Sequence, residues 1–291
     1  MFKSKKVSWE EKSVDIKGVK THYLVGGSGM PLLLIHGWPL AFYPPDSLQD
    51  NFLSKASQCF RVYAPDLPGF GQSEKADFPP DIHKYADFLT RFRKTLKIKK
   101  HAVVGWSFGG MVAVKYAALN CEDITALVLC ATAVSAKHIA NHFLKRLFKT
   151  VNFACERIPL VEDLFEKLLK NDKILAWSWQ KITPLDPSFS FENDPSILSL
   201  KKLPVSFSRQ IFQSGIKVNL KKDCHLLKNT PVFILSGEKD RLMTVEAGKE
   251  IDQLVGEAHF LIVPSTEHWN VLNQDSIEII LAFLKDISHR F

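Results

Sequence analysis

The sequence predicts an α/β protein with a mostly parallel sheet of about eight strands, helices on both faces and a helical cap insertion. Short apolar runs typical of buried strands alternate with segments of helical periodicity. This alternation stops at residues 134–225 and then resumes. Near the middle of the chain, Ser107 occupies a Gly-x-Ser-x-Gly motif between an apolar run and an apolar helix. We therefore expect a core formed by residues 1–133 and 226–291, with residues 134–225 as a cap, or lid.

The first half of the chain contains most of the predicted strands. A hairpin is expected where two short runs flank Gly18. The next run, residues 31–35, is apolar throughout, as in a strand that is buried on both faces. The expected elements in this half are strands at 14–16, 21–25, 31–35, 60–65, 101–104 and 124–130, and helices within 44–58 and at 82–97 and 111–119.

Residues 134–225 are predicted to be mainly helical. Apolar residues recur there at spacings of three and four, which predicts amphipathic helices at 139–151 and 161–169. Four prolines, at positions 184, 187, 195 and 204, break the remainder into shorter pieces. The alternation then resumes with strands at 231–236 and 259–263 and helices at 244–254 and 270–288.

The motif around Ser107 predicts a catalytic serine. A serine hydroxyl is a weak nucleophile at neutral pH and needs a base that a third group orients. Of the ten histidines, only His268 lies in the loop directly after the last predicted strand. The acid is expected before it in the chain, and Asp240 is our choice in the loop after the preceding strand, with Glu238 as the alternative. The loop after residues 124–130 contains no carboxylate, which favours Asp240.

An oxyanion intermediate needs two N–H donors aimed at the developing charge. The backbone amide of Phe108, next to the nucleophile, is expected to provide one. The amide of Trp38 is expected to provide the other, since Pro39 has no N–H. His36 is interpreted as shaping this loop, although a catalytic base is the alternative, and Asp66 and Ser73 are expected to brace the loop after residues 60–65.

The substrate pocket is expected to be apolar. Eight of the 21 phenylalanines lie in residues 134–225, and some of them are expected to line an acyl or aromatic pocket beneath the cap. The candidate pocket residues are Trp106, Phe143, Trp177 and Trp269. The five cysteines form no C-x-x-C pair or Cys/His cluster, so we expect no metal and no cofactor.

The positive charge is concentrated in the insertion. Residues 134–225 contain fifteen Lys or Arg and nine Asp or Glu, so they account for +6 of the total charge of +7. This excess is expected either to steer an acidic substrate, a carrier protein or a membrane surface toward the site, or to be the solvated face of amphipathic helices. Six candidate side chains are Lys145, Arg146, Lys149, Lys201, Lys202 and Arg209. No nucleic-acid motif, signal peptide or membrane-spanning run is evident, which predicts a cytoplasmic protein.

Taken together, the motifs resemble the α/β-hydrolase fold superfamily, and in particular its capped serine carboxylesterases. The resemblance rests on His36-Gly37-Trp38, residues 66–73 (Asp-Leu-Pro-Gly-Phe-Gly-Gln-Ser), residues 105–110 (Gly-Trp-Ser-Phe-Gly-Gly), Gly237 to Asp240, and His268. It covers nearly all of the chain outside residues 134–225. The motifs are similar to those of the esterases that demethylate a pimeloyl ester on acyl-carrier protein in biotin synthesis.

Other branches of the superfamily fit less well. The loop at residues 36–39 (His-Gly-Trp-Pro) is also similar to that of epoxide hydrolases, but these have an aspartate where Ser107 stands. The His-Gly-Gly-Pro-Gly loop of proline iminopeptidases and the Gly-rich loop of meta-cleavage carbon–carbon hydrolases are absent. The expected activity is cleavage of a small-molecule carboxylic ester. The alternatives are a ligand-sensing protein on this scaffold, or hydrolysis of a thioester, lactone or carbon–carbon bond by the same residues.

Overall fold

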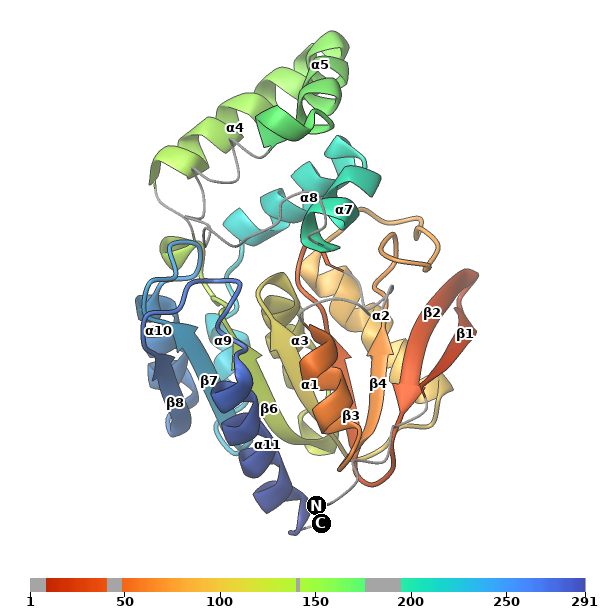
Figure 1. Cartoon of the computed structure of the whole chain (residues 1–291), viewed down its shortest axis with the longest axis vertical. Coiled ribbons are helices and arrows are strands. Elements are labelled where there is room, and N and C mark those ends of the chain that lie inside the picture. Colours follow the sequence, from red (N-terminus) through yellow and green to blue (C-terminus); the bar gives the residue numbers. More distant parts are fainter. Residues whose placement is uncertain (1–8, 41–48, 140–141, 176–194, 291) are drawn as a thin grey trace.

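The computed structural model describes residues 9–40, 49–139, 142–175 and 195–290. Within them, one sheet of eight strands has the order β1-β2-β4-β3-β5-β6-β7-β8 (Figure 1). The strands are β1 (Glu10–Ile16), β2 (Val19–Gly26), β3 (Pro31–Ile35), β4 (Arg61–Pro65), β5 (His101–Trp106), β6 (Ile124–Cys130), β7 (Val232–Gly237) and β8 (Ala258–Val263). The predicted mostly parallel α/β sheet is confirmed.

One strand of the sheet, β2, runs opposite to all the others. β1 and β2 form the predicted hairpin, and β2 pairs antiparallel with β4. Every pairing from β4 to β8 is parallel. The carboxyl ends of the parallel strands therefore share one edge of the sheet, which is where ligands bind in folds of this kind.

Helices cover both faces of the sheet (Figure 1). One face carries α1 (Gln49–Ala56) and α11 (Gln274–Ser288). The other carries α2 (Ile82–Thr95), α3 (Phe108–Leu119), α9 (Lys221–His225) and α10 (Val245–Val255). The strands β5 and β6, at the centre of the sheet, are buried at every position, because both of their faces pack against helices.

The chain between β6 and β7 forms the predicted helical insertion. Its described helices are α4 (His142–Arg157), α5 (Pro159–Leu169), α7 (Pro195–Lys202) and α8 (Val205–Ile216), followed by α9. In Figure 1, α8 lies above the carboxyl edge of the sheet, and the α4–α5 hairpin lies beyond it at the far end of the molecule. α9 packs against α3 and α10, so the chain has returned to the core layer there. The division into domains at residues 134 and 225 stays a prediction.

Several helix boundaries differ from the sequence prediction, and the largest difference is in α4, which ends at Arg157 instead of at residue 151. α3 begins at Phe108, directly after the motif serine, instead of at Met111. α11 begins at Gln274, because the side chain of Asn273 accepts a hydrogen bond from the Ser276 amide and caps the helix.

No helix among the described residues is long and apolar enough to span a bilayer.

Candidate active site

Ser107 sits on a strained turn between β5 and α3. Its φ of 55° lies in a region that non-glycine residues rarely adopt. Its amide donates to the Cys130 carbonyl at 2.9 Å, which ties the turn to the neighbouring strand. The carbonyl of Ser107 accepts a hydrogen bond from Thr132 Oγ1 at 2.7 Å. Sequence reasoning missed Thr132, because no motif indicates which residue of an adjacent strand end reaches the turn.

Glycines make this turn possible. A Cβ on Gly105 would lie 2.6 Å from Ala113 Cβ, and one on Gly109 would lie 2.3 Å from the His36 carbonyl oxygen. Both distances are shorter than real side chains allow. The motif glycines are therefore required by the close approach of α3 and the β3 loop to the turn.

The predicted serine, histidine and aspartate form one hydrogen-bonded chain. The Ser107 Oγ lies 2.9 Å from His268 Nε2, and His268 Nδ1 lies 2.7 Å from Asp240 Oδ2. All three are buried, with exposed fractions of 7%, 2% and 5%. Ser107 follows β5, Asp240 follows β7 and His268 follows β8, and the parallel sheet brings these three strand ends to one edge.

The second oxygen of Asp240 is held by the backbone. Its Oδ1 accepts hydrogen bonds from the amides of Leu242 and Met243, each at 2.8 Å. The alternative acid, Glu238, is exposed and accepts instead from the Ser265 amide at 2.7 Å. Of these two carboxylates, only Asp240 is a hydrogen-bond partner of His268.

Two tryptophans surround the histidine ring. The indole of Trp106 stacks on His268 with ring centroids 5.9 Å apart, and Trp269 meets the His268 ring edge-on at 5.1 Å. Trp106 is only 5% exposed and packs among the apolar residues beneath α1 and α11. The structure therefore places both indoles beside His268, and their expected contact with substrate stays a prediction. The side chain of Phe143 and all of Trp177 lie outside the described residues.

The loop after β3 approaches the serine turn closely. A Cβ on Gly37 would lie 3.2 Å from Ser107 Cβ, so the backbone just before Trp38 passes close to the nucleophile. The His36 ring accepts from the Leu67 amide at 3.0 Å through Nε2 and donates to the Gly37 carbonyl at 3.0 Å through Nδ1. Burial lowers the pKa of His36, which favours the neutral ring that these two bonds require. His36 thus shapes the loop, as expected.

The loop after β4 is braced as predicted. Ser73 Oγ donates to the Asp66 carbonyl at 2.7 Å and accepts from the His22 amide at 2.9 Å. Asp66 Oδ2 accepts from the Gln72 amide at 3.1 Å and lies 2.9 Å from His22 Nδ1. Asp66 and Ser73 are therefore structural residues of this loop. The sequence alone gave no sign that His22 joins them from β2.

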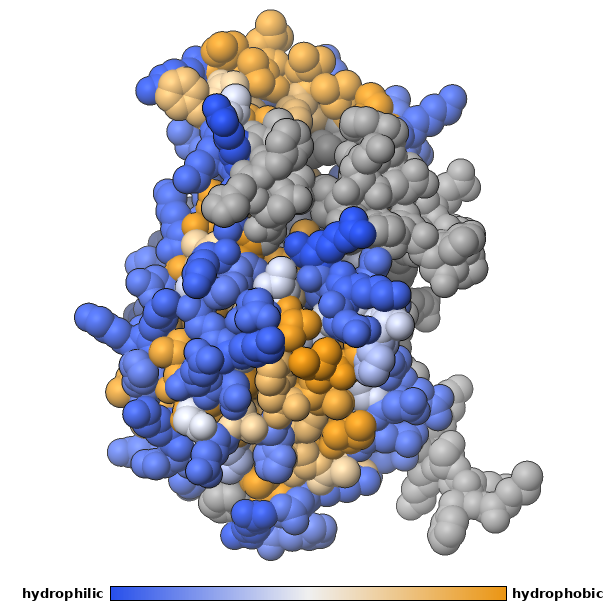
Figure 2. Space-filling model, turned by 90° about the vertical axis from the view of Figure 1, so that its left-hand side faces the viewer, coloured by the Kyte–Doolittle hydropathy of each residue, from blue (hydrophilic) through white to orange (hydrophobic). Residues whose placement is uncertain are grey.

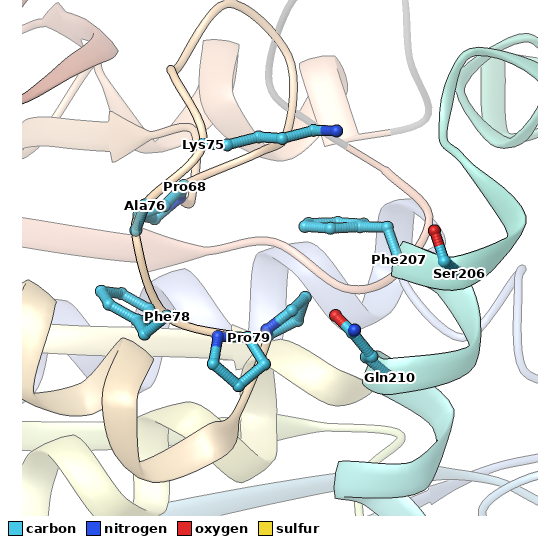
Figure 3. Close-up of a pocket in the computed structure, with 9 residues that line it drawn as sticks. Pro68, Lys75, Ala76, Phe78, Pro79, Ser206, Phe207 and Gln210 are labelled. Carbon is cyan, nitrogen blue, oxygen red and sulfur yellow. The ribbon is translucent and has the colours of Figure 1, made fainter. Parts of the chain in front are cut away.

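A cavity of about 170 Å³ lies between the loop after β4 and α8 (Figure 3). Its walls include Pro68, Phe78, Phe207 and Gln210. Phe207 also packs edge-on against Phe70, with ring centroids 5.2 Å apart. None of the three hydrogen-bonded residues at the strand ends lines this cavity, so it is separate from the candidate reaction centre.

Among the described residues, no three His, Cys, Asp or Glu side chains gather as metal ligands would.

The six basic candidates of the insertion have different surroundings. Lys145 donates to the Ala136 carbonyl, Lys201 pairs with Asp172, and Arg209 pairs with Glu162. These three support the fold of the insertion. The other three, Arg146, Lys149 and Lys202, are exposed.

The fold and site together define an α/β hydrolase, and comparison with known proteins agrees. The model of a family described as having the alpha/beta hydrolase fold matches residues 30–275, so the chain belongs to the α/β-hydrolase fold family. This confirms the resemblance on which the sequence prediction rested.

Two relatives and one solved structure illustrate the range of this family. The chain is 26% identical to the 2-hydroxy-6-oxo-6-(2'-aminophenyl)hexa-2,4-dienoic acid hydrolase of Metapseudomonas resinovorans, over 95% of this chain and 91% of that protein. It is also 26% identical to the pimeloyl-[acyl-carrier protein] methyl ester esterase of Aliivibrio fischeri, over 89% and 95%. A thermophilic esterase from Thermogutta terrifontis shares the fold, with a TM-score of 0.68 at 20% identity over 96% and 99% of the chains. Hydrolase chemistry is common to all three.

Proposed function

We propose that this hydrolase is a serine carboxylesterase that works through an acyl-enzyme intermediate. In the first step, Ser107 Oγ attacks the ester carbonyl carbon while His268 Nε2 accepts the hydroxyl proton. The tetrahedral intermediate collapses, and His268 returns the proton to the departing alcohol. Asp240 holds the histidine with Nε2 facing the serine and stabilises the imidazolium.

The amides of Trp38 and Phe108 stabilise the oxyanion in this proposal. The approach of Gly37 to Ser107 supports Trp38, and the position of Phe108 at the first turn of α3 supports its amide as the second donor. Water then attacks the acyl-enzyme and His268 accepts a proton from it; as the acyl–Oγ bond breaks, His268 gives that proton to Ser107 Oγ and the free acid leaves. The cycle consumes one ester and one water, releases one alcohol and one acid, and needs no cofactor.

The observation that supports this proposal most directly is a pair of hydrogen bonds. Asp240 Oδ2 lies 2.7 Å from His268 Nδ1, and His268 Nε2 lies 2.9 Å from Ser107 Oγ. The Ser107–His268 distance is within reach for proton transfer, and the Asp240–His268 distance is that of a hydrogen bond that orients the ring. The strained φ of Ser107 gives further support, since a folded protein retains such a conformation where the surrounding structure imposes it.

A carbon–carbon hydrolase is the second candidate. The 26% identity to the dienoic acid hydrolase extends over 95% of this chain, so the similarity includes the insertion that would form the pocket. The same serine and histidine would serve either reaction. The two candidate functions therefore differ in their substrates and share the same reacting residues.

The test compares wild type with Ser107→Ala and His268→Ala on p-nitrophenyl esters of increasing acyl length. Each variant is expected to lose about 10³-fold or more in kcat, because these residues act as one unit. A loss smaller than about ten-fold in either variant would overturn the assignment. The dienoic acid named above is assayed in parallel, and turnover of that acid alone would favour the second candidate.

A ligand-sensing role makes a different prediction in the same assay. Wild type would then turn over none of the substrates, while Ser107→Ala and wild type would bind a small molecule equally well by calorimetry. Labelling of Ser107 by a fluorophosphonate, detected as a mass increase on its peptide, would exclude an inert serine.

A further inference from the structure

The α4–α5 hairpin exposes apolar side chains on its outer surface. Leu160, Leu164 and Leu168 follow one another at four-residue intervals on α5, with exposed fractions of 75%, 56% and 37%. Phe153 on α4 and Ile158 at the turn are 57% and 51% exposed. Figure 2 shows hydrophobic side chains gathered at the end of the molecule that α4 and α5 form in Figure 1. We call these five residues the hairpin stripe.

Three acidic side chains of the hairpin contact α8. Glu166 accepts from the Val205 amide at 3.0 Å, Glu156 accepts from Gln213 at 3.2 Å, and Glu162 lies 3.6 Å from Arg209. An ordinary surface helix turns its apolar side to the protein and its charged side to water. In this hairpin, three acidic side chains contact the rest of the protein and the leucines are exposed to solvent. This reversed arrangement indicates that the outer side of the hairpin meets an apolar environment.

Basic side chains accompany the stripe. Arg146, Lys149, Arg157 and Lys167 are exposed on the same two helices. None of them forms an ion pair with any part of the chain that the structure describes. The guanidinium of Arg157 lies 3.6 Å from the centre of the Phe153 ring, so charge and apolar surface are in direct contact there.

We propose that the α4–α5 hairpin docks on a lipid bilayer with anionic headgroups. The leucines would enter the boundary of the acyl chains while the basic side chains meet the headgroups, which is the combination found in helices that lie in a membrane interface. A second copy of the chain fits less well, since a two-fold contact through the stripe would bring the same basic residues together. Docking would hold α8 and the carboxyl edge of the sheet toward the bilayer (Figure 1).

The test is sedimentation of the purified full chain with vesicles of phosphatidylcholine alone or phosphatidylcholine with phosphatidylglycerol. Wild type is expected to bind the anionic vesicles at least about ten-fold more strongly. Raising the ionic strength to about 1 M should reduce that preference, because the Debye length falls to about 3 Å. Absence of wild-type binding to both kinds of vesicle would overturn the proposal.

Two variants separate the apolar and the basic contributions. Replacing Leu160, Leu164 and Leu168 together by serine is expected to weaken vesicle binding by roughly a hundred-fold or more, because each loses its apolar side chain. A second variant with glutamine at Arg146, Lys149 and Lys167 is expected to keep the fold and bind both kinds of vesicle equally. If either variant binds as wild type does, the hairpin is not the docking surface.

The matched control removes exposed leucines elsewhere on the chain. Leu119→Ser with Leu226→Ser, at positions 47% and 62% exposed, should leave vesicle binding unchanged. All variants should hydrolyse a soluble short-chain ester within about two-fold of wild type, so that loss of docking is distinct from failure of the proposed activity. Gel filtration completes the test: a dimeric wild type that becomes monomeric when the three leucines are replaced would show that a second copy covers the stripe.

Discussion

Asp240 binds His268 with one carboxylate oxygen and the backbone with the other. Oδ2 lies 2.7 Å from His268 Nδ1, while Oδ1 accepts two amide hydrogen bonds at 2.8 Å from Leu242 and Met243. The two amides fix the plane of the carboxylate, so the direction in which Oδ2 faces the imidazole is fixed as well. This arrangement has a consequence for an amide replacement.

Asp240→Asn is expected to fold normally and to lower kcat by about 10³-fold to 10⁴-fold. The asparagine oxygen would keep the two backbone donors, which leaves its NH₂ group facing His268 Nδ1. The histidine would then carry its proton on Nε2 and could not accept the serine proton. Steady-state kinetics on a p-nitrophenyl ester measures the effect.

The matched control is Glu238→Gln, which changes a carboxylate two residues away that contacts only the Ser265 amide. It is expected to change kcat by less than about three-fold, because its carboxylate makes no bond to His268. A larger loss in Glu238→Gln than in Asp240→Asn would assign the acid to Glu238.

The meeting of Ser107, Asp240 and His268 could be predicted from chain order, and their catalytic roles stay a prediction. Parallel strands bring their carboxyl ends to one edge, so a serine, an aspartate and a histidine that each follow a strand are expected to meet. The Asp240–His268–Ser107 contacts follow from that rule. The central strands β5 and β6 were equally predictable, since runs buried on both faces are apolar throughout, whereas the exposed strand β1 begins at Glu10 instead of at residue 14.

Contacts that depend on the packing of individual side chains could not be predicted. The bond from Thr132 to the Ser107 carbonyl and the stacking of Trp106 on His268 depend on side-chain geometry and not on order. The outward-facing leucines of α5 were also missed. The periodic pattern of 161–169 indicates a helix with one apolar side, but it does not say which side faces the protein.

The stacking of Trp106 on His268 predicts a positioning role. Trp106→Leu is expected to lower kcat about ten-fold with little change in KM. The imidazole would lose the indole that stacks on it, so its Nε2 would be less well aligned with Ser107. Trp106→Phe should recover most of the loss, since a smaller aromatic ring can still stack. Steady-state kinetics of both variants measures the two constants.

Loss of stability alone would not produce this split between kcat and KM. Phe283→Leu provides the comparison, since it removes aromatic contacts with Phe233 and His259 at centroid distances of 5.3 Å and 5.2 Å, outside the site. It is expected to lower the Tm and leave kcat unchanged. If Trp106→Phe is as impaired as Trp106→Leu, stacking is not the property that matters.

The approach of Gly37 to the serine turn predicts that a single methyl group there is harmful. A Cβ at this position would lie 3.0 Å from the Trp106 carbonyl oxygen and 3.2 Å from Ser107 Cβ. Gly37→Ala is therefore expected to displace the loop or the serine by a few tenths of an ångström and to lower kcat by about a hundred-fold. Kinetics and a thermal melt on the same preparation separate activity from stability.

Gly215→Ala makes the opposite prediction. Gly215 lies in α8 and nothing approaches its added Cβ within 4 Å. Alanine there should raise the free energy of unfolding by about 0.5 to 1 kcal/mol and leave kcat unchanged. Equal effects of the two substitutions on kcat would mean that the contact at Gly37 is unimportant.

The buried His101 predicts a loss of stability in acid. Its Nε2 accepts from the Tyr116 hydroxyl at 2.8 Å and its Nδ1 donates to the Lys99 carbonyl at 2.5 Å, an arrangement that requires the neutral ring. Burial lowers the pKa of His101 from 6.5 to about 4. The unfolded chain therefore binds a proton at His101 before the folded protein does, and the stabilising effect is lost as the pH falls below the unfolded value.

His101→Phe isolates this effect, because phenylalanine cannot titrate. The variant is less stable near pH 7.5, where it lacks the bond to Tyr116, but its disadvantage should shrink by about 2 kcal/mol between about pH 7.5 and about pH 5. Urea unfolding of both proteins at several pH values measures the difference, and groups that titrate in both, such as His36, cancel in it. A difference that stays constant across this range would mean that His101 has an ordinary pKa in the folded protein.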